Sequence, residues 1–255
     1  MNKKTAQAFQ EIDRRFYEEC ADAFDATRQQ PWSGFSEILN RVSGPLSVLD
    51  LGCGNGRFAQ TLAKHRAVER YVGIDQSVAL LSRAETLNLP FNASFQQGDL
   101  LSAHYQWPSG RFSLVVALGL MHHIPGFSQR SALLNNAAMQ VAPAGLLAVS
   151  FYRYNRSPRM MRRLIKPHSQ PEFADLPASD FEAGDYLIPF GQTGRLRYCH
   201  LFSDAEIKAL SHISGLTCAD RFTPATGSDH LNDYLLWRRT ADDPPDSIPG
   251  PIEPS

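Results

Sequence analysis

The sequence predicts an α/β protein built on a largely parallel sheet that is buried on both faces. Short apolar runs rich in Val, Ile and Leu alternate with longer polar and apolar segments, which is the pattern of β-α-β units. The first run ends in a glycine-rich turn, and three successive runs carry acids at their ends. Open α/β sheets bind their ligands at the carboxyl edge, where all of these features would lie.

The elements are expected in the following order. Apolar residues recur at steps of three and four from Phe9 to Phe24, which predicts an amphipathic helix. Strands are then expected within residues 46–52, 71–75, 93–99, 112–120 and 145–154. Almost fifty residues without a sustained period follow, and such a segment is typical of a lid or binding loop.

A late helix and two closing strands complete the predicted fold. Ser203 and Glu206 form a capping box at the start of the helix, and Gly215 is placed to end it. The last strands are expected within 216–224 and 233–240. We therefore divide the chain into a helical cover (1–43), an α/β domain (44–240) with a substrate-side insertion (153–202), and an acidic, proline-rich tail (241–255) that we expect to be disordered.

Composition narrows the function only slightly. The net charge of the 255 residues is -1, and the tail holds four acids and no base, so the rest of the chain carries -1 + 4 = +3. Bulk electrostatic binding of nucleic acid is not indicated. The four cysteines are scattered, which predicts neither a disulfide framework nor a metal site. The polar start and the lack of long apolar runs predict a cytoplasmic protein without membrane association.

The turn in "VLDLGCGNG", residues 48–56, indicates the kind of cofactor. Gly52, Gly54 and Gly56 are spaced G-x-G-x-G, whereas a dinucleotide turn needs its third glycine where Arg57 stands. The Gly-Lys-Ser/Thr of a phosphate-binding loop is also absent. Asp50 would repel a polyphosphate and attract a cationic amine or sulfonium. These features favour S-adenosylmethionine, although a tight strand-to-helix connection without a ligand remains the simpler alternative for the turn alone.

Two further acids support a nucleoside cofactor. Asp75 ends the second strand, where a carboxylate can accept hydrogen bonds from both ribose hydroxyls. Asp99 follows the third strand and would accept from an adenine amino group. A single acid at a strand end is more often a helix cap, but three acids after three successive strands favour a binding site.

Over residues 44–240 the chain resembles the class I S-adenosylmethionine-dependent methyltransferases. The resemblance rests on "VLDLGCGNG", "GID", "GD" and "APAGLLAVS", with Ala144 where the family usually has a glycine. It implies a Rossmann-like class I methyltransferase fold, with a seven-stranded, mostly parallel sheet, an antiparallel last strand and helices on both faces. The cofactor-binding residues predicted from motif and resemblance are Asp50, Gly52, Gly54, Asn55, Gly56, Asp75, Gln76, Asp99, Leu100 and Leu118.

Two clusters are candidates for the methyl acceptor. "GLMHHIPG" places His122 and His123 after the fourth strand, where His123 would touch the acceptor as a base or hydrogen-bond donor. In the alternative, one ring packs and the other caps the strand. "RLRYCHLF" contains Arg197, which would bind a carboxylate or phosphate through two parallel hydrogen bonds, although surface arginines are common. His123 and Arg197 are the predicted catalytic residues.

The segments "FYEECADAFDATRQQPW", "GLMHHI" and "RLRYCHLF" are similar to segments of the tRNA wobble-uridine methyltransferases, which esterify the carboxylate of 5-carboxymethyluridine. Cys199 departs from that family's second tyrosine. The resemblance implies a tRNA substrate, a small zinc-binding activator subunit as a partner, and no metal in this chain. The predicted substrate-binding residues are Arg28, Trp32, His122, Tyr198 and His200.

Alternatives stay open at this level. The run 153–168 has six Lys/Arg and no acid, so it is either a phosphate-binding segment, a solvated helix face, or a partner of the acid-rich stretch that follows. A small-molecule O- or N-methyltransferase with His123 as the base is the main rival reading. A third is a non-catalytic partner subunit that keeps the fold.

Overall fold

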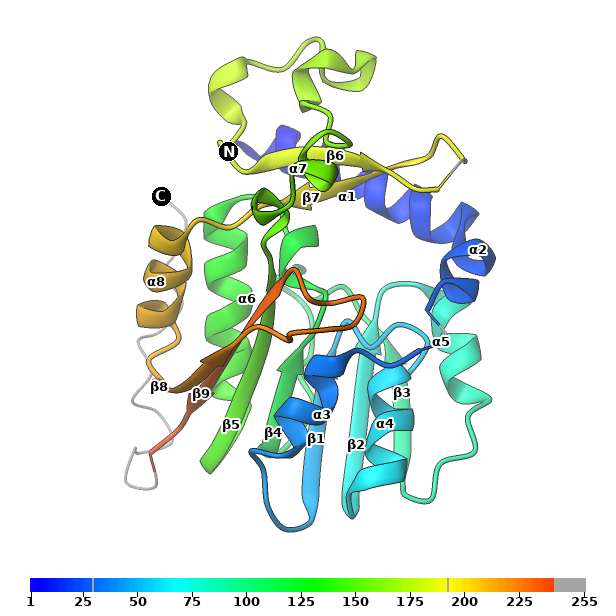
Figure 1. Ribbon diagram of the computed structural model, residues 1–255, viewed down its shortest axis with the longest axis vertical. Helices are drawn as coiled ribbons and strands as arrows, with labels where there is room; N and C mark the ends of the chain where they lie inside the picture. The colour runs from blue at the N-terminus through cyan, green and yellow to red at the C-terminus, as the bar shows by residue number, and fades with distance from the viewer. Residues whose placement is uncertain (29, 192, 241–255) are drawn as a thin grey trace.

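The computed structural model describes residues 1–28, 30–191 and 193–240, and its centre is a seven-stranded sheet (Figure 1). The strand order is β3-β2-β1-β4-β5-β9-β8; β1 to β5 run parallel, and β9 runs antiparallel to both β5 and β8. The predicted sheet is confirmed, including its antiparallel last strand. The proposed disordered tail lies outside the described residues. The strands are β1 (Leu46–Leu51), β2 (Val68–Asp75), β3 (Ala93–Gln97), β4 (Phe112–Ala117), β5 (Val141–Tyr152), β8 (Thr217–Phe222) and β9 (Asn232–Arg238).

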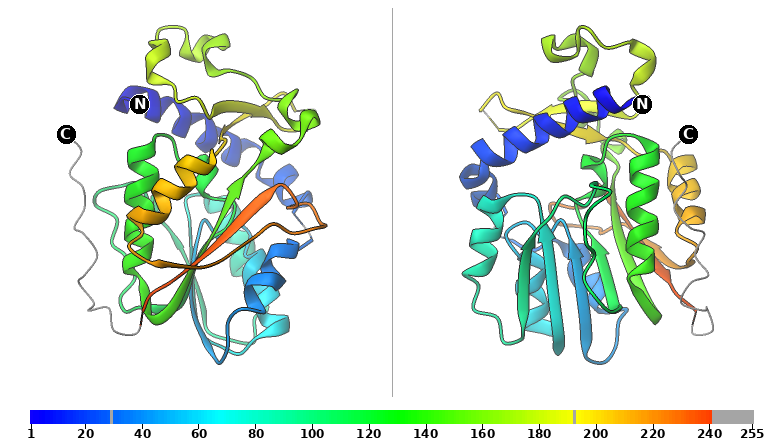
Figure 2. Two further views of the ribbon diagram at one scale, coloured as in Figure 1. Left: turned by 60° about the vertical axis from the view of Figure 1, so that its left-hand side comes forward. Right: turned by 180° about the vertical axis from the view of Figure 1, so that it is seen from behind.

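Alternation along the central strands builds two hydrophobic cores, one on each face of the sheet. In β4, Leu114 and Val116 pack on the face covered by α3 (Ser33–Leu39) and α4 (Arg57–His65). Val115 and Ala117 pack on the other face, under α6 (Phe127–Met139) and α8 (Asp204–Ile213). Figure 2 shows these layers, with α5 (Val78–Glu85) beside β2 and β3. No helix among the described residues is long and apolar enough to cross a membrane.

The predicted N-terminal helix forms as two pieces, α1 (Lys3–Glu19) and α2 (Ala21–Ala26), separated at Cys20. Phe9 and Phe16 are buried on the inner side of α1, and the ring centroid of Phe9 lies 4.3 Å from that of Tyr198. Figure 1 shows α1 lying across the carboxyl edge of the sheet. The helix therefore covers the edge at which a ligand is expected.

The insertion contains regular structure that the sequence pattern does not reveal. β6 (Asp185–Pro189) and β7 (Leu196–His200) pair as an antiparallel hairpin, which packs against α1 above the sheet (Figures 1 and 2). The strands are not visible in the sequence because polar residues, among them Asp185, Arg197 and His200, occupy buried positions in them. The other elements are the short helix α7 (Pro158–Met161) and the 3₁₀ turns Met121–His123, Tyr154–Arg156, Pro167–Ser169, Pro171–Phe173 and Ala178–Asp180.

The predicted capping box of α8 forms only in part. The Ser203 hydroxyl accepts from the Glu206 backbone N–H at 3.1 Å, and Gly215 follows the helix with a φ of +64°. The Glu206 carboxylate does not return to the Ser203 backbone; it contacts His200 and Arg130 instead. Ion pairing with the insertion therefore replaces half of the cap.

Ala144 offers a test of local strain. Its φ is +60°, a left-handed conformation that costs an L-residue about 1–2 kcal/mol and that glycine adopts freely. Because glycine also loses more entropy on folding, we predict that Ala144→Gly raises the free energy of unfolding by about 0.5–1 kcal/mol, measured by urea denaturation. Ala63→Gly inside α4 should lower it by about 1 kcal/mol. A lower stability for Ala144→Gly would contradict the assignment of strain.

Candidate active site

A cavity of about 520 Å³ lies between the carboxyl edge of the sheet and its N-terminal cover. The glycine turn and the ends of β2, β3 and β4 line one side of it. Residues of α1, the segment around Arg28 and Trp32, and Arg197 of β7 line the other. The cavity thus joins three parts of the chain that are far apart in sequence.

The glycine turn follows β1 in a conformation that favours residues without a side chain. The φ angles of Gly52, Gly54 and Gly56 are +72°, +55° and +78°. A Cβ atom on Gly52 would lie 3.1 Å from the Leu120 side chain. Gly52 and Gly54 line the cavity, so backbone is exposed to a ligand there, while Gly56 precedes α4.

The three predicted acids line the cavity. Asp50 is buried and accepts from the Tyr71 hydroxyl at 2.6 Å; burial raises the pKa of this carboxyl to about 7. Asp75 is held by the backbone N–H groups of Gly54 (2.8 Å) and Ser77 (2.9 Å). Burial also raises the pKa of Asp75, and these two donors oppose the rise. Asp99 is exposed and accepts from the Leu101 N–H at 2.9 Å.

On the opposite side, His123 is held between two residues of α1. Its Nδ1 lies 2.8 Å from Asp13 Oδ2, and its Nε2 lies 3.1 Å from the Tyr17 hydroxyl. All three side chains line the cavity. The arrangement orients the imidazole towards the place where an acceptor would enter.

Arg197 is the buried cation of the site. It lies on β7, is 8% exposed and lines the cavity, and its guanidinium carbon is 5.0 Å from the ring centroid of Phe16 and 5.5 Å from that of Phe190. No acid in the described part of the chain forms an ion pair with it, and its Nε has no hydrogen-bond partner there. Burial of a guanidinium that forms no direct ion pair is costly, which indicates a site for an anion; Asp13 contributes negative charge only from a greater distance.

Comparison with known proteins identifies the domain around the glycine turn. Residues 48–145 match the family model described as "Methyltransferase domain". Residues 48–145 therefore form a methyltransferase domain.

Individual relatives agree with this assignment. The ubiquinone biosynthesis O-methyltransferase of Coxiella burnetii is 33% identical over 112 residues, which are 42% of this chain and 44% of that protein. The trans-aconitate 2-methyltransferase of Methylobacterium nodulans is 32% identical over 144 residues, 54% of this chain and 51% of that protein. The chain thus spans about half the length of these curated relatives. The structure of the N-methyltransferase NodS from Bradyrhizobium japonicum, in complex with S-adenosyl-L-homocysteine, covers 91% of this chain and 98% of its own at 18% identity and a TM-score of 0.57.

The residues of the methyltransferase domain fit S-adenosylmethionine, its cofactor. The turn leaves backbone open to the cavity where a Cβ would crowd Leu120, and the carboxylates of Asp50 and Asp75 supply negative charge and hydrogen-bond acceptors. Asn55, Gln76, Leu100 and Leu118 also line the cavity. Asn55 Nδ2 donates to Asp25 Oδ1 at 2.6 Å, which ties the turn to α2. The individual ribose and adenine contacts stay predictions.

The structure places Tyr198 and His200, which were predicted to bind substrate, outside the lining of the cavity. Successive side chains of a strand point to opposite sides. Arg197 lines the cavity, whereas Tyr198 and His200 point to the other side of β7. The Tyr198 hydroxyl donates to Asp185 at 2.7 Å, while His200 lies 2.9 Å from Asp185 and 2.8 Å from Glu206. Both side chains are buried, and neither is among the residues that line the cavity.

His122 also lies away from the cavity lining. It is buried and stacks on Tyr152, with 3.5 Å between the ring centroids, and burial holds its pKa well below the usual value. The buried ring therefore packs against a residue of the cavity lining, and its contact with a substrate stays a prediction. Of the histidine pair, His123 is the member that lines the cavity.

The N-terminal cover contributes both predicted and unpredicted residues to the cavity. The predicted residues Arg28 and Trp32 line it, and Trp32 packs against Gly119, where a Cβ would lie 2.8 Å from its ring. Asp13 and Tyr17 also line the cavity, and the sequence analysis does not predict them. Asp13 falls on the same helical stripe as Phe9 and Phe16, and a carboxylate within an apolar stripe is a signal that could have revealed it.

Glu182, His200 and Glu206 present ligand-type atoms within 4.8 Å of one another. The buried guanidinium of Arg130 forms ion pairs with Glu182 and with Glu206, the latter at 2.7 Å. Arg130 therefore supplies positive charge to this cluster. The absence of a bound metal stays a prediction.

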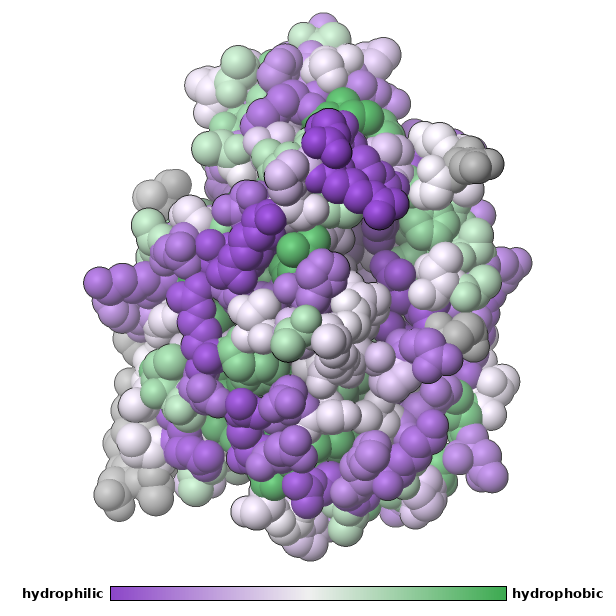
Figure 3. All heavy atoms as spheres, in the orientation of Figure 1, coloured by the Kyte–Doolittle hydropathy of each residue, from purple (hydrophilic) through white to green (hydrophobic). Residues whose placement is uncertain are grey.

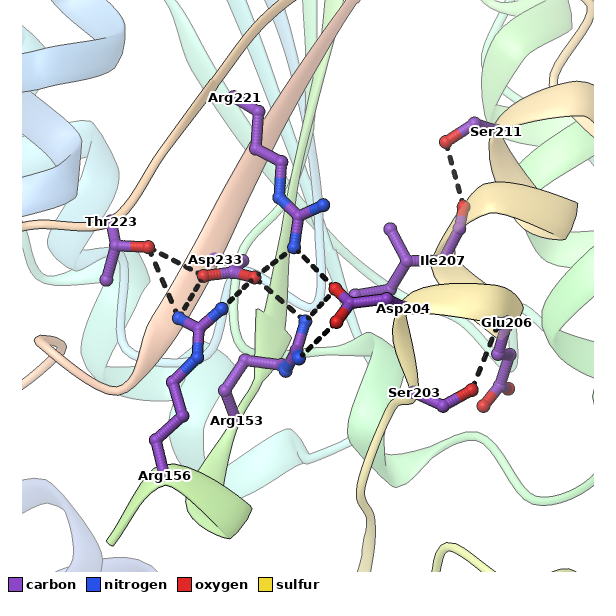
Figure 4. Close-up of polar contacts among 10 residues, drawn as sticks. All are labelled: Arg153, Arg156, Ser203, Asp204, Glu206, Ile207, Ser211, Arg221, Thr223 and Asp233. Carbon is purple, nitrogen blue, oxygen red and sulfur yellow. Dashed lines mark hydrogen bonds and ion pairs between the residues drawn. The ribbon is translucent and has the colours of Figure 1, made fainter.

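The basic run 153–168 is used partly inside the protein. Figure 4 shows Arg153 and Arg156 with Arg221 around Asp233, and Arg153 also reaches Asp204 at 2.8 Å. The alternative in which the run pairs with the acid-rich stretch 171–185 is wrong for these two arginines, since their partners lie on α8 and β9. Other basic residues of the run are exposed as well, among them Arg159, Arg162 and Arg163. Figure 3 shows strongly hydrophilic surface in the region of α7.

Asp50 makes the binding of the cofactor depend on pH. The pKa of Asp50 is about 7 in the folded protein and near 4 in the unfolded chain. Asp50 therefore stabilises the cofactor-free fold fully at pH values below about 4, and this contribution is lost as the pH rises through about 7. A cationic ligand prefers the ionised carboxylate, so we predict that the Kd for S-adenosylmethionine rises up to about eightfold between about pH 7.5 and about pH 6. The Asp50→Asn variant serves as the control for the titration of the ligand itself. Calorimetry on this variant should show weak binding whose Kd does not change with pH in this way. An equal slope in both proteins would refute the role of Asp50.

Proposed function

We propose that the protein is an S-adenosylmethionine-dependent methyltransferase that esterifies a carboxylate, and that this carboxylate belongs to a 5-carboxymethyl group on a tRNA wobble uridine. The observation that carries the proposal is Arg197, a buried guanidinium with no acidic partner among the described residues, in the same cavity as the glycine turn. A carboxylate would neutralise it and fit its planar fork.

The chemistry asks little of the protein beyond orientation. When bound, S-adenosylmethionine supplies an activated methyl group that transfers in line to a nucleophile. A carboxylate is already ionised at neutral pH, so no strong base is needed. Arg197 holds one face of the carboxylate and turns an oxygen towards the glycine turn. Phe16 and Phe24 beside the guanidinium exclude water and strengthen the ion pair.

A nucleoside acceptor is supported by aromatic residues that line the cavity and by basic residues of the insertion. Trp32 and Tyr152 line the cavity and are the kinds of side chain on which a pyrimidine stacks. Arg159, Arg162 and Arg163 are exposed on the insertion that also carries Arg197 and suit contacts with phosphates. The three segments that resemble the wobble-uridine enzymes contain Arg28 and Trp32, His123 and Arg197, all of which line this cavity.

A small-molecule acceptor is the second candidate, and the Asp13–His123 pair favours it. When Nδ1 of His123 donates to Asp13, Nε2 can take a proton from a hydroxyl acceptor that displaces Tyr17 from it. The trans-aconitate relative is named for a small carboxylic acid, which an arginine such as Arg197 would also hold. Both acceptors use the same anion site.

Replacement of Arg197 separates a role in the site from a role in the fold. Arg197→Lys keeps the charge but loses the planar fork, so we expect cofactor affinity to stay within about twofold while kcat/KM for the acceptor falls about 10²-fold. Calorimetry and a methyl-transfer assay measure the two effects. The matched control is Arg195→Lys, whose exposed side chain pairs with Glu19 at 2.6 Å. Unchanged turnover in Arg197→Lys would remove the carboxylate role.

The acceptor itself is tested with the full chain, methyl-labelled donor and either total tRNA or a metabolite extract. The proposal predicts a base-labile methyl ester on a wobble uridine, detected by nucleoside mass spectrometry after digestion. Label confined to a small acid would favour the second candidate. Label stable to alkali would indicate a methylated hydroxyl or amine and contradict esterification.

A further inference from the structure

Asp13 joins three segments of the acceptor side through two hydrogen bonds. Its Oδ2 lies 2.8 Å from His123 Nδ1, and its Oδ1 accepts the backbone N–H of Tyr198 at 2.8 Å. The side chain is almost fully buried, so both oxygens depend on these donors rather than on water. Asp13 thus fixes His123 from one side and the strand that carries Arg197 from the other.

An ionised carboxylate only accepts hydrogen bonds, so the ionised Asp13 sets the direction of the hydrogen bonds from Asp13 through His123 to Tyr17. Nδ1 of His123 must carry the proton that points to Asp13. In the neutral ring, Nε2 is then bare and accepts the hydroxyl proton of Tyr17, 3.1 Å away. The Tyr17 oxygen therefore presents lone pairs to the cavity, and burial raises the pKa of Tyr17, which keeps its proton in place.

We propose that Asp13 is the positioning residue of the acceptor side: it holds His123 as the Nδ1–H tautomer, turns the Tyr17 proton onto Nε2, and fixes the β7 backbone beside Arg197. The N-terminal helix is then part of the site rather than a passive cover. Tyr17 shields the bare Nε2 from a carboxylate bound to Arg197. For an acceptor with a hydroxyl, the same Nε2 is the proton acceptor once Tyr17 is displaced.

The tautomer can be measured without any turnover. In the full chain labelled with ¹⁵N-histidine, long-range ¹H–¹⁵N spectra distinguish a protonated from a bare ring nitrogen, and the loss of signals in His123→Gln assigns the residue. We expect a protonated Nδ1 and a bare Nε2 in the wild type. A protonated Nε2 with a bare Nδ1 would overturn the inference.

Asp13→Asn should invert this tautomer. The new amide oxygen keeps the Tyr198 N–H, and the amide NH₂ then donates to Nδ1, which moves the ring proton to Nε2. The kinetic test of the positioning role of Asp13 rests on the proposed function. In Asp13→Asn we expect kcat to fall about 10²-fold while the affinity for S-adenosylmethionine is unchanged. A wild-type tautomer and wild-type kcat in Asp13→Asn would refute it.

Two further variants keep the test decisive. Glu11→Gln removes a carboxylate from the exposed face of the same helix, where it pairs with Arg14 and Arg15, and should change neither the spectrum nor kcat. If Asp13→Asn does not fold, Tyr17→Phe serves instead; the Nδ1–H tautomer should persist there because Asp13 sets it, and its loss would count against the inference. A wild type with the expected tautomer but no methylated acceptor would retain the positioning of His123 and reject the proposed function.

Discussion

The acceptor side of the cavity depends on the carboxylate of Asp13. The N-terminal helix, the turn after β4 and the hairpin of the insertion meet at its two oxygens, although Asp13, His123 and Tyr198 are far apart in sequence. Burial of an ionised carboxylate is costly, and two donors with short, direct hydrogen bonds offset that cost. The same bonds decide where His123 points and how β7 presents Arg197. One constraint therefore links the position of the cover to the chemistry beneath it.

The insertion is held from behind by a second polar cluster. Arg130 on α6 reaches Glu182 of the insertion and Glu206 of α8, and Asp185 of β6 binds both Tyr198 and His200 of β7. Side chains of β7 alternate between its two faces. Arg197 on one face points to the cavity, and the side chains on the other face connect the hairpin to the helices of the main domain. The anion site thus lies on a strand that is fixed on both sides.

Sequence predicted those features that depend on local pattern. Runs such as that of β4 are apolar on both faces, and the G-x-G-x-G spacing is a property of five consecutive residues, so the sheet and the turn could be predicted. The hairpin β6–β7 could not, because buried polar residues such as Arg197 and His200 hide its apolar pattern and its strands pair only through contacts formed in the fold. The side on which Tyr198 and His200 lie depends on the placement of that hairpin, and the role of Asp13 depends on two partners more than a hundred residues away.

The distribution of positive charge bears on the size of the acceptor. Asp233 and Asp204 neutralise Arg153 and Arg156 internally, so the basic run does not act as one continuous phosphate-binding surface. The exposed basic residues of the run include Arg159, Arg162 and Arg163, and these belong to the same insertion as the buried Arg197. Under the proposed function one segment would hold both the carboxylate and the nearby phosphates of its acceptor. For a free acid the exposed arginines would have no partner, and salt would weaken binding far less than it does for a nucleic acid.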